Sequence, residues 1–201
     1  MKKRYIIILI CIFLIIFSFF YYNFFINGNN IFKKSDEEII DNILNADFNY
    51  TAEANVTIYS NKNQNTYEIK QEETKEHSFL EVISDGDIKG LNLEYEENKL
   101  ILKNTELNLE KIFENYNELS SNYLFLKSFI KEYLESEDIK ISEEDENTIV
   151  VKITLLNSNK YIKYKELYID RKTELPKKLI IKNSDKQIKV CIIYTNIKIL
   201  Q

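Results

Sequence analysis

The sequence predicts an α+β fold built on one large, curved antiparallel sheet. Apolar and polar residues alternate over many short stretches, and links of only a few polar residues join these stretches. Apolar residues at helical spacing occur in few places beyond the N-terminal apolar run. Because a sheet of about ten strands does not stay flat, we expect an incomplete β-barrel with helices on its concave face.

The first 28 residues are typical of a membrane anchor. No side chain between Arg4 and Lys33 is charged. At about 1.5 Å per residue, residues 6–26 are long enough to cross a hydrocarbon core of ~30 Å. We therefore expect residues 1–28 to form a cytoplasmic stub and a transmembrane helix, and residues 29–201 to form one domain outside the cell membrane. The residues taken to represent this single-pass anchor are Ile6, Leu9, Phe13, Ile16 and Phe20.

Cleavage and lipidation of this segment are the alternatives to a retained anchor. No small-x-small cleavage site follows the apolar run, which argues against removal by signal peptidase. Cys11 follows Ile10, whereas a bacterial lipobox has a small residue at that position. Both observations favour retention of the helix.

Composition excludes several classes of function. Three of the 27 basic residues precede the domain, which leaves 24 basic against 32 acidic residues and a formal charge of −8. An acidic domain is not suited to nucleic acid. His77 is the only histidine and Cys191 the only cysteine of the domain, too few for a zinc site, and no glycine-rich nucleotide motif occurs. We expect no enzyme activity, no metal and no cofactor.

The first half of the domain predicts one helix followed by a run of strands. Ser35 and Glu38 have the spacing of a capping box, and apolar residues recur after them on one helical face. From Tyr50 the period changes to two, which places Ala52, Ala54, Val56 and Ile58 on one face of a strand. Further strands are expected near residues 66–73, 78–84, 88–95 and 99–103.

The second half predicts two helices and then more strands. The first helix is indicated by Leu109, Ile112, Phe113 and Tyr116, and the second by Leu126, Phe129, Ile130, Tyr133 and Leu134. The acidic segments 72–76 and 143–146 are expected to be solvated turns. Later strands are expected at residues 149–155, 161–170, 177–183 and 187–198.

Tyrosines near the start of one of these strands are candidate partner-binding residues. Tyr161, Tyr164 and Tyr168 alternate with Lys160, Lys163 and Lys165. Tyrosine gives a large contact area, so this stretch has the composition of a binding surface. Ordinary cross-strand pairing is the alternative interpretation.

Residues 167–179 read Leu-Tyr-Ile-Asp-Arg-Lys-Thr-Glu-Leu-Pro-Lys-Lys-Leu, and residues 194–196 read Tyr-Thr-Asn. This pattern resembles the C-terminal hairpin of LolA/LolB-like proteins. Asp170 and Thr173 suit the turn, and Pro176 is tolerated at a strand start. The matching positions, all structural, are Leu167, Ile169, Asp170, Thr173, Leu175, Pro176, Lys178, Leu179 and Asn196.

Within this family the chain is most similar to GerS-like germination proteins of spore-forming clostridia. That resemblance implies a non-enzymatic protein-binding module that supports a CwlD-like cell-wall amidase of the spore cortex during sporulation and germination. The alternative implied by the family is a lipid or lipoprotein carrier that binds acyl chains on its concave face. GerS is a lipoprotein, whereas this chain has the features of a transmembrane anchor.

Overall fold

The computed structural model describes residue 17 and residues 34–45, 47–96, 99–116, 123–156 and 158–200. The chain divides into two compact units, residues 1–38 and 39–201. The predicted anchor residues Ile6, Leu9, Phe13, Ile16 and Phe20, and the predicted boundary after residue 28, lie outside the described residues. Among the residues described, no helix has the length and apolar character needed to cross a membrane.

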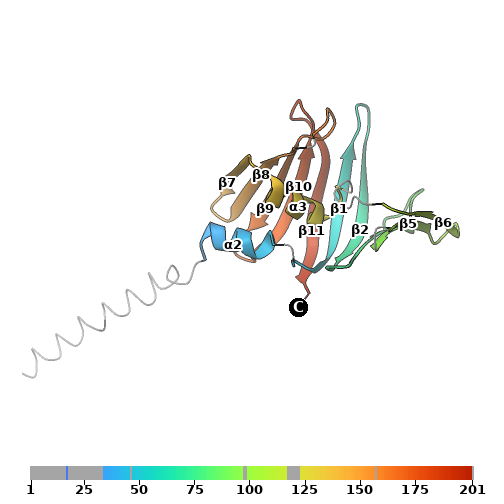
Figure 1. The fold of residues 1–201 in the computed structure, drawn as a ribbon, viewed down its shortest axis with the longest axis horizontal. Coiled ribbons are helices and arrows are strands. Elements are labelled where there is room, and N and C mark those ends of the chain that lie inside the picture. The colour runs from blue at the N-terminus through green and yellow to red at the C-terminus, as the bar shows by residue number, and fades with distance from the viewer. Residues whose placement is uncertain are drawn as a thin grey trace, which may run out of the picture. The chain divides into compact units, whose positions relative to one another are not determined.

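One antiparallel sheet of eleven strands dominates the second unit (Figure 1). The strands lie in the order β6-β5-β4-β3-β2-β1-β11-β10-β9-β8-β7, so only the β1–β11 pair joins strands far apart in sequence. The sheet is not closed, and β6 and β7 form its two edges. The strands are β1 (Tyr50–Tyr59), β2 (Gln64–Glu73), β3 (His77–Val82), β4 (Leu91–Glu96), β5 (Lys99–Asn104), β6 (Leu109–Phe113), β7 (Ile139–Asp145), β8 (Thr148–Thr154), β9 (Tyr164–Asp170), β10 (Leu175–Lys182) and β11 (Ile188–Ile199).

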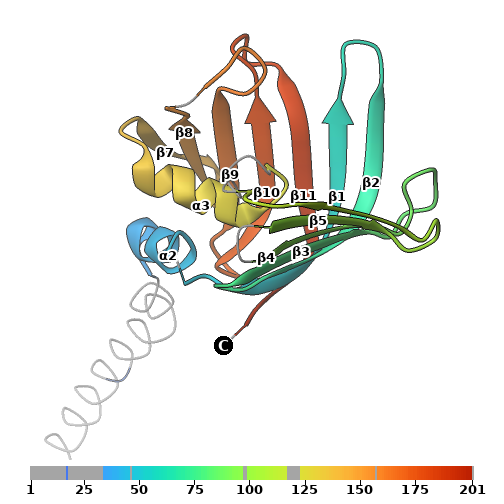
Figure 2. The ribbon, with the colours of Figure 1, turned by 45° about the vertical axis from the view of Figure 1, so that its right-hand side comes forward.

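The helices α2 (Asp36–Ile43) and α3 (Leu126–Glu135) bury their apolar residues in the same core as the inward residues of the sheet. Figure 2 shows the sheet bending, with β3, β4 and β5 turning forward and both helices on the concave side. The expected curved, incomplete barrel is therefore confirmed. The inward sheet residues of this core include Ala52, Ala54, Val56, Ile149, Val151, Ile153, Leu167, Leu179 and Ile192.

The local signals for two elements are confirmed in detail. The Ser35 hydroxyl accepts the Glu38 N–H at 3.2 Å at the start of α2, as a capping box requires. In β8 the period-two pattern places Ile149, Val151 and Ile153 in the core. Two apolar residues that the patterns placed on buried faces are exposed: Ile58 near the end of β1 and Leu134 near the end of α3.

The helix predicted from Leu109, Ile112, Phe113 and Tyr116 is wrong. Residues Leu109–Phe113 form strand β6, which pairs with β5 from Leu100↔Phe113 to Asn104↔Leu109. The link between the two strands is a turn in which Asn104 Oδ1 accepts the Leu107 N–H at 2.9 Å and Asn108 has φ 50°. Pairing with β5 outweighs the helical spacing, since five residues are too short to fix a helix by themselves.

The acidic segment 143–146 is also not a turn as a whole. Glu143, Glu144 and Asp145 complete the edge strand β7, a strand that the sequence did not indicate, and the turn is limited to Glu146 and Asn147. Asp145 Oδ1 accepts the Asn147 N–H at 2.8 Å and closes that turn. Charged side chains suit an edge strand, because they discourage pairing with another sheet.

Candidate functional site

Helix α3 begins without a cap from its own chain segment. Its N-cap residue Phe125 makes no side-chain capping hydrogen bond. The first N–H groups are accepted by side chains of the sheet: the Leu126 N–H by the Tyr50 hydroxyl at 3.2 Å, and the Lys127 N–H by Glu73 Oε2 at 2.9 Å. Strands β1 and β2 therefore fix the position at which α3 starts.

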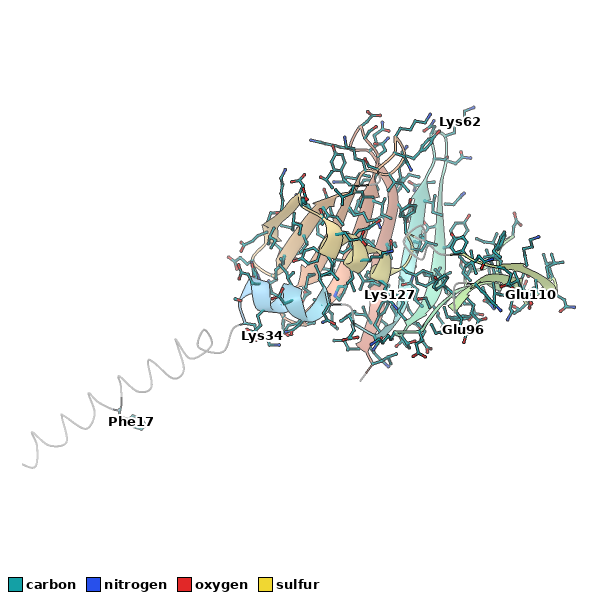
Figure 3. The ribbon with its side chains drawn as sticks, in the orientation of Figure 1. Phe17, Lys34, Lys62, Glu96, Glu110 and Lys127 are labelled. Atoms are coloured by element: carbon teal, nitrogen blue, oxygen red, sulfur yellow. The ribbon has the colours of Figure 1, made fainter. Side chains whose placement is uncertain are left out.

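A buried polar network surrounds this helix start. Gln71 donates to the Leu124 carbonyl at 2.8 Å and accepts the Tyr50 hydroxyl at 3.3 Å. The Lys127 ammonium group donates to the carbonyl oxygens of Thr74 and Lys75 at 2.8 and 3.1 Å, and Figure 3 labels Lys127 at this end of α3. The network ties α3 to both β2 and the turn that follows it.

Glu73 departs most from its sequence-based interpretation. The acidic segment 72–76 predicted a solvated turn, but the Glu73 side chain points into the core and the residue is 1% exposed. Burial raises the pKa of Glu73 to about 7, against the hydrogen bonds from the Lys127 N–H and Tyr50 that lower it. Burial also raises the pKa of Tyr50 well above its ordinary value.

A second buried ionisable group fixes the middle of α3. Lys165 of β9 is fully buried, donates to Ser128 Oγ at 2.9 Å and forms an ion pair with Glu132. Its ammonium group also lies 4.9 Å from the centre of the Tyr123 ring. Burial lowers the pKa of Lys165 and raises that of Glu132, as expected for a desolvated pair. Sheet residues thus hold α3 against the concave face at two places along its length.

At the other end of the sheet, β4, β5 and β6 form an arm that projects beyond β2 (Figure 1). Alternation and pairing place one set of mainly apolar side chains on the same face of the arm as the core residue Leu80. In β6 this face is well exposed, with Leu109 at 62% and Phe113 at 40%. The apolar members of the set are Leu91, Leu93, Tyr95, Leu100, Leu102, Leu109 and Phe113.

The opposite face of the arm carries a row of charged side chains beside the paired residues Ile101 and Ile112. Glu94 lies 3.2 Å from His77 and 3.3 Å from Lys103, and Lys103 lies 3.8 Å from Glu110. His77, the single histidine of the domain, is thus half-buried in a row of charges. Figure 3 labels Glu110 on the outer part of the arm. Because β6 pairs with β5 alone among the residues that the structure describes, the arm presents an apolar face beside an open sheet edge.

The residues of the family motif lie in the β9–β10 hairpin and on β11. Asp170 Oδ1 accepts the N–H groups of Lys172 and Thr173 at 3.0 and 2.8 Å and the Thr173 hydroxyl at 3.1 Å. Leu175 and Pro176 begin β10, where Pro176 lies opposite Ile169. Leu167, Ile169 and Leu179 are core residues, and Asn196 pairs with Glu53 at a β-bulge.

The three candidate tyrosines have different environments. Tyr161 is exposed in the segment before β9, while Tyr164 and Tyr168 share the outer face of β9. Tyr168 packs against Val150 and Ile180, and the Lys178 ammonium group lies 3.7 Å from the centre of its ring. Cys191 packs half-buried against this outer cluster.

Comparison with solved structures places this fold among known proteins. The GerS lipoprotein, seen in complex with the CwlD amidase from Clostridioides difficile, is 26% identical, with a TM-score of 0.52 over 81% of this chain and 95% of that chain. An uncharacterized conserved protein from Thermus thermophilus shares the fold at 11% identity, with a TM-score of 0.54 over 84% and 89% of the two chains. A LolA superfamily protein from Nitrosomonas europaea is 12% identical, with a TM-score of 0.40 over 82% and 91%.

The resemblance to GerS expected from the C-terminal hairpin is therefore confirmed. A comparison with curated proteins finds no match. Almost the whole sequence, residues 2–201, matches the family described as "Sporulation protein YdcC-like", and the chain belongs to this family.

Proposed function

We propose that this protein is a membrane-tethered, non-enzymatic binding module that supports a CwlD-like cell-wall amidase during sporulation. The observation that carries this proposal is the likeness to GerS, because the match covers 95% of the GerS chain. GerS itself was seen in a complex with the CwlD amidase. Membership of a sporulation family supports the same process. The proposed tether is the apolar segment 6–26.

The arm supports a role in protein binding. Strand β6 has an unpaired side, so a strand of a partner can extend the sheet there by backbone hydrogen bonds. Leu109 and Phe113 lie beside this edge and supply apolar contact area. Asn104 and Lys111 lie on the same face as Leu109 and Phe113, so this face combines apolar contact area with polar groups, as protein interfaces do.

The buried carboxyl group of Glu73 and the buried ammonium group of Lys165 serve the structure, which supports a function without catalysis. Glu73 accepts the Lys127 N–H at the start of α3, and Lys165 pairs with Glu132 in its middle. Both side chains are directed at α3 and lie inside the core. Their raised and lowered pKa values follow from burial rather than from an arrangement for proton transfer.

Titration of a purified CwlD-like amidase with the full chain in detergent tests this proposal. We expect a complex at micromolar concentrations or below, and Phe113→Glu should weaken it by at least about tenfold, because a charge would replace an apolar contact. Ile193→Glu is the matched control, since Ile193 is 46% exposed against 40% for Phe113 but lies on β11. The proposal fails if no complex forms at micromolar concentrations. If the control weakens binding as much as Phe113→Glu, the arm is not the interface.

A carrier of acyl chains is the second candidate, favoured by the apolar concave face of the curved sheet. Against it, α3 fills part of that face and is held there by Glu73 and Lys165. Native mass spectrometry of the full chain extracted from membranes distinguishes the two functions. Stoichiometric acyl chains in the released protein would support the carrier, and their absence together with amidase binding would support the binding module.

A further inference from the structure

A pocket of about 480 Å³ opens on the outer face of β8, β9 and β10, the face opposite α3. Lys152, Glu166 and Lys182 line it, and they alternate along their strands with the buried residues Ile153, Lys165 and Ile181. Lys165 also borders the pocket, but its ammonium group lies on the other face of the sheet, at Ser128. The remaining lining residues are Asp138, Lys140, Ile153, Thr154, Lys163, Tyr164 and Lys186.

Both acidic side chains of the pocket are already engaged. Glu166 lies 2.6 Å from Lys182. Asp138 accepts the Thr154 hydroxyl at 2.7 Å and lies 3.7 Å from Lys140. Two of the five lysines that direct their charge to this side, Lys140 and Lys182, therefore have an acidic neighbour.

The other three lysines have no acidic partner within the described part of the chain: Lys152, Lys163 and Lys186. The Lys163 ammonium group lies 5.5 Å from the centre of the Tyr164 ring, which holds it near the pocket without cancelling its charge. The pocket thus carries an excess of positive charge in a domain whose formal charge is −8. This local excess is opposite in sign to the rest of the domain.

Strand pairing brings two lysines of the pocket together, and a bound anion would reduce the repulsion between their charges. Lys140 lies directly opposite Lys152 in the β7–β8 pair, and like charges in this position destabilise a sheet. On its other side Lys152 lies opposite Glu166, whose carboxylate already pairs with Lys182. A negative group in the pocket would offset the repulsion between the two lysines.

We propose that this pocket binds a phosphate group carried by a ligand larger than inorganic phosphate. Lysine ammonium groups bind phosphate by charge-assisted hydrogen bonds, and several converging lysines suit a group with more than one charge. A volume of about 480 Å³ lies in the range of small-molecule sites and exceeds the need of a single phosphate. A hollow of this kind favours a compact ligand over a flat protein surface. The proposal is independent of amidase binding.

Calorimetric titration of the full chain in nonionic detergent at low salt tests the site. The probes are inorganic phosphate, short poly(glycerol phosphate) and dihexanoyl phosphatidylglycerol. We expect binding of one of the two larger probes on the order of millimolar or tighter, and weaker binding of inorganic phosphate. The affinity should fall as salt rises. Tighter binding of poly(glycerol phosphate) would identify the ligand as a phosphate polymer, and tighter binding of dihexanoyl phosphatidylglycerol would identify it as a lipid headgroup.

The double variant Lys152→Gln/Lys186→Gln should weaken binding at least about tenfold, because it removes two of the three unpaired charges. Lys62→Gln/Lys172→Gln is the control with the same change in net charge. Lys62 lies at the tip of the β1–β2 hairpin (Figure 3), and Lys172 in the β9–β10 turn.

Equal loss in both variants would mean that net charge, and not the pocket, binds the probe. Absence of binding by every probe at about 10 mM would also overturn the proposal. The proposal would also be overturned if the pocket variant lost amidase binding but kept its affinity for the probes, since an acidic protein surface would then be the ligand of the pocket.

Discussion

Glu73 makes the stability of this protein depend on pH in an unusual direction. Burial raises its pKa to about 7 from an ordinary value of 4.5. Between these values the folded chain holds a proton that the unfolded chain has released, so the free energy of unfolding falls as pH rises from 4.5 to 7. The loss amounts to roughly 3 kcal/mol, at about 1.4 kcal/mol for each unit of pKa.

Glu73→Gln should remove this dependence. Glutamine keeps an oxygen that accepts the Lys127 N–H but cannot ionise. We expect the variant to unfold with nearly the free energy of the unaltered chain near pH 4.5 and to be more stable above pH 7. Urea denaturation followed by circular dichroism, repeated from about pH 4.5 to about pH 8, measures the difference. Glu72→Gln is the control, since the exposed neighbour Glu72 lies on the outer face of β2. Parallel pH curves for Glu73→Gln and the unaltered chain would contradict the raised pKa.

At the scale of elements, the pair of Lys165 and Glu132 docks α3 onto β9. Removing one partner of a buried pair leaves a charge without compensation, at a cost of about 3–5 kcal/mol. The two partners are not equivalent, because the Lys165 side chain is fully buried whereas the Glu132 side chain is 17% exposed and can regain water. Glu132→Leu should therefore destabilise the protein more than Lys165→Met.

The double variant Lys165→Met/Glu132→Leu should recover most of this loss. It replaces the ion pair by two apolar side chains of similar length, and such replacements are often nearly neutral. Denaturation of the two single variants and the double variant gives the coupling free energy between α3 and β9. Strictly additive losses would show that the two side chains do not stabilise each other.

At the scale of the whole molecule, the proposed tether at residues 6–26 would decide where the domain acts. The pair of substitutions Leu9→Lys and Phe13→Lys should release the protein from the membrane fraction, since each lysine near the centre of a span costs about 2.5–3.5 kcal/mol. Leu9→Ile/Phe13→Leu keeps the segment apolar and is the control. Fractionation of cells that express each variant checks the prediction. Retention of the lysine variant in the membrane fraction would show that another feature tethers the chain.

The sequence by itself determined the features that depend on neighbouring residues. The capping box at Ser35, the period of two in β8 and the helical spacing from Leu126 each need only a short stretch of chain. Hairpin links of a few residues then imply an antiparallel sheet with curvature. The family resemblance rests on the same kind of local pattern, in the turn that Asp170 closes.

Only the tertiary structure decided which elements meet. The segment at 109–113 carries apolar residues at a spacing that suits a helix, and pairing with β5 makes it a strand. Glu73 and Lys165 look like solvated charges in the sequence, but their partners on α3 lie 54 and 37 residues away. The five lysines that direct their charge to the outer pocket likewise come from three separate strands, β7, β8 and β10, and from the segments before β9 and after β10. Burial and pairing between distant residues depend on the folded arrangement, and a local pattern does not contain them.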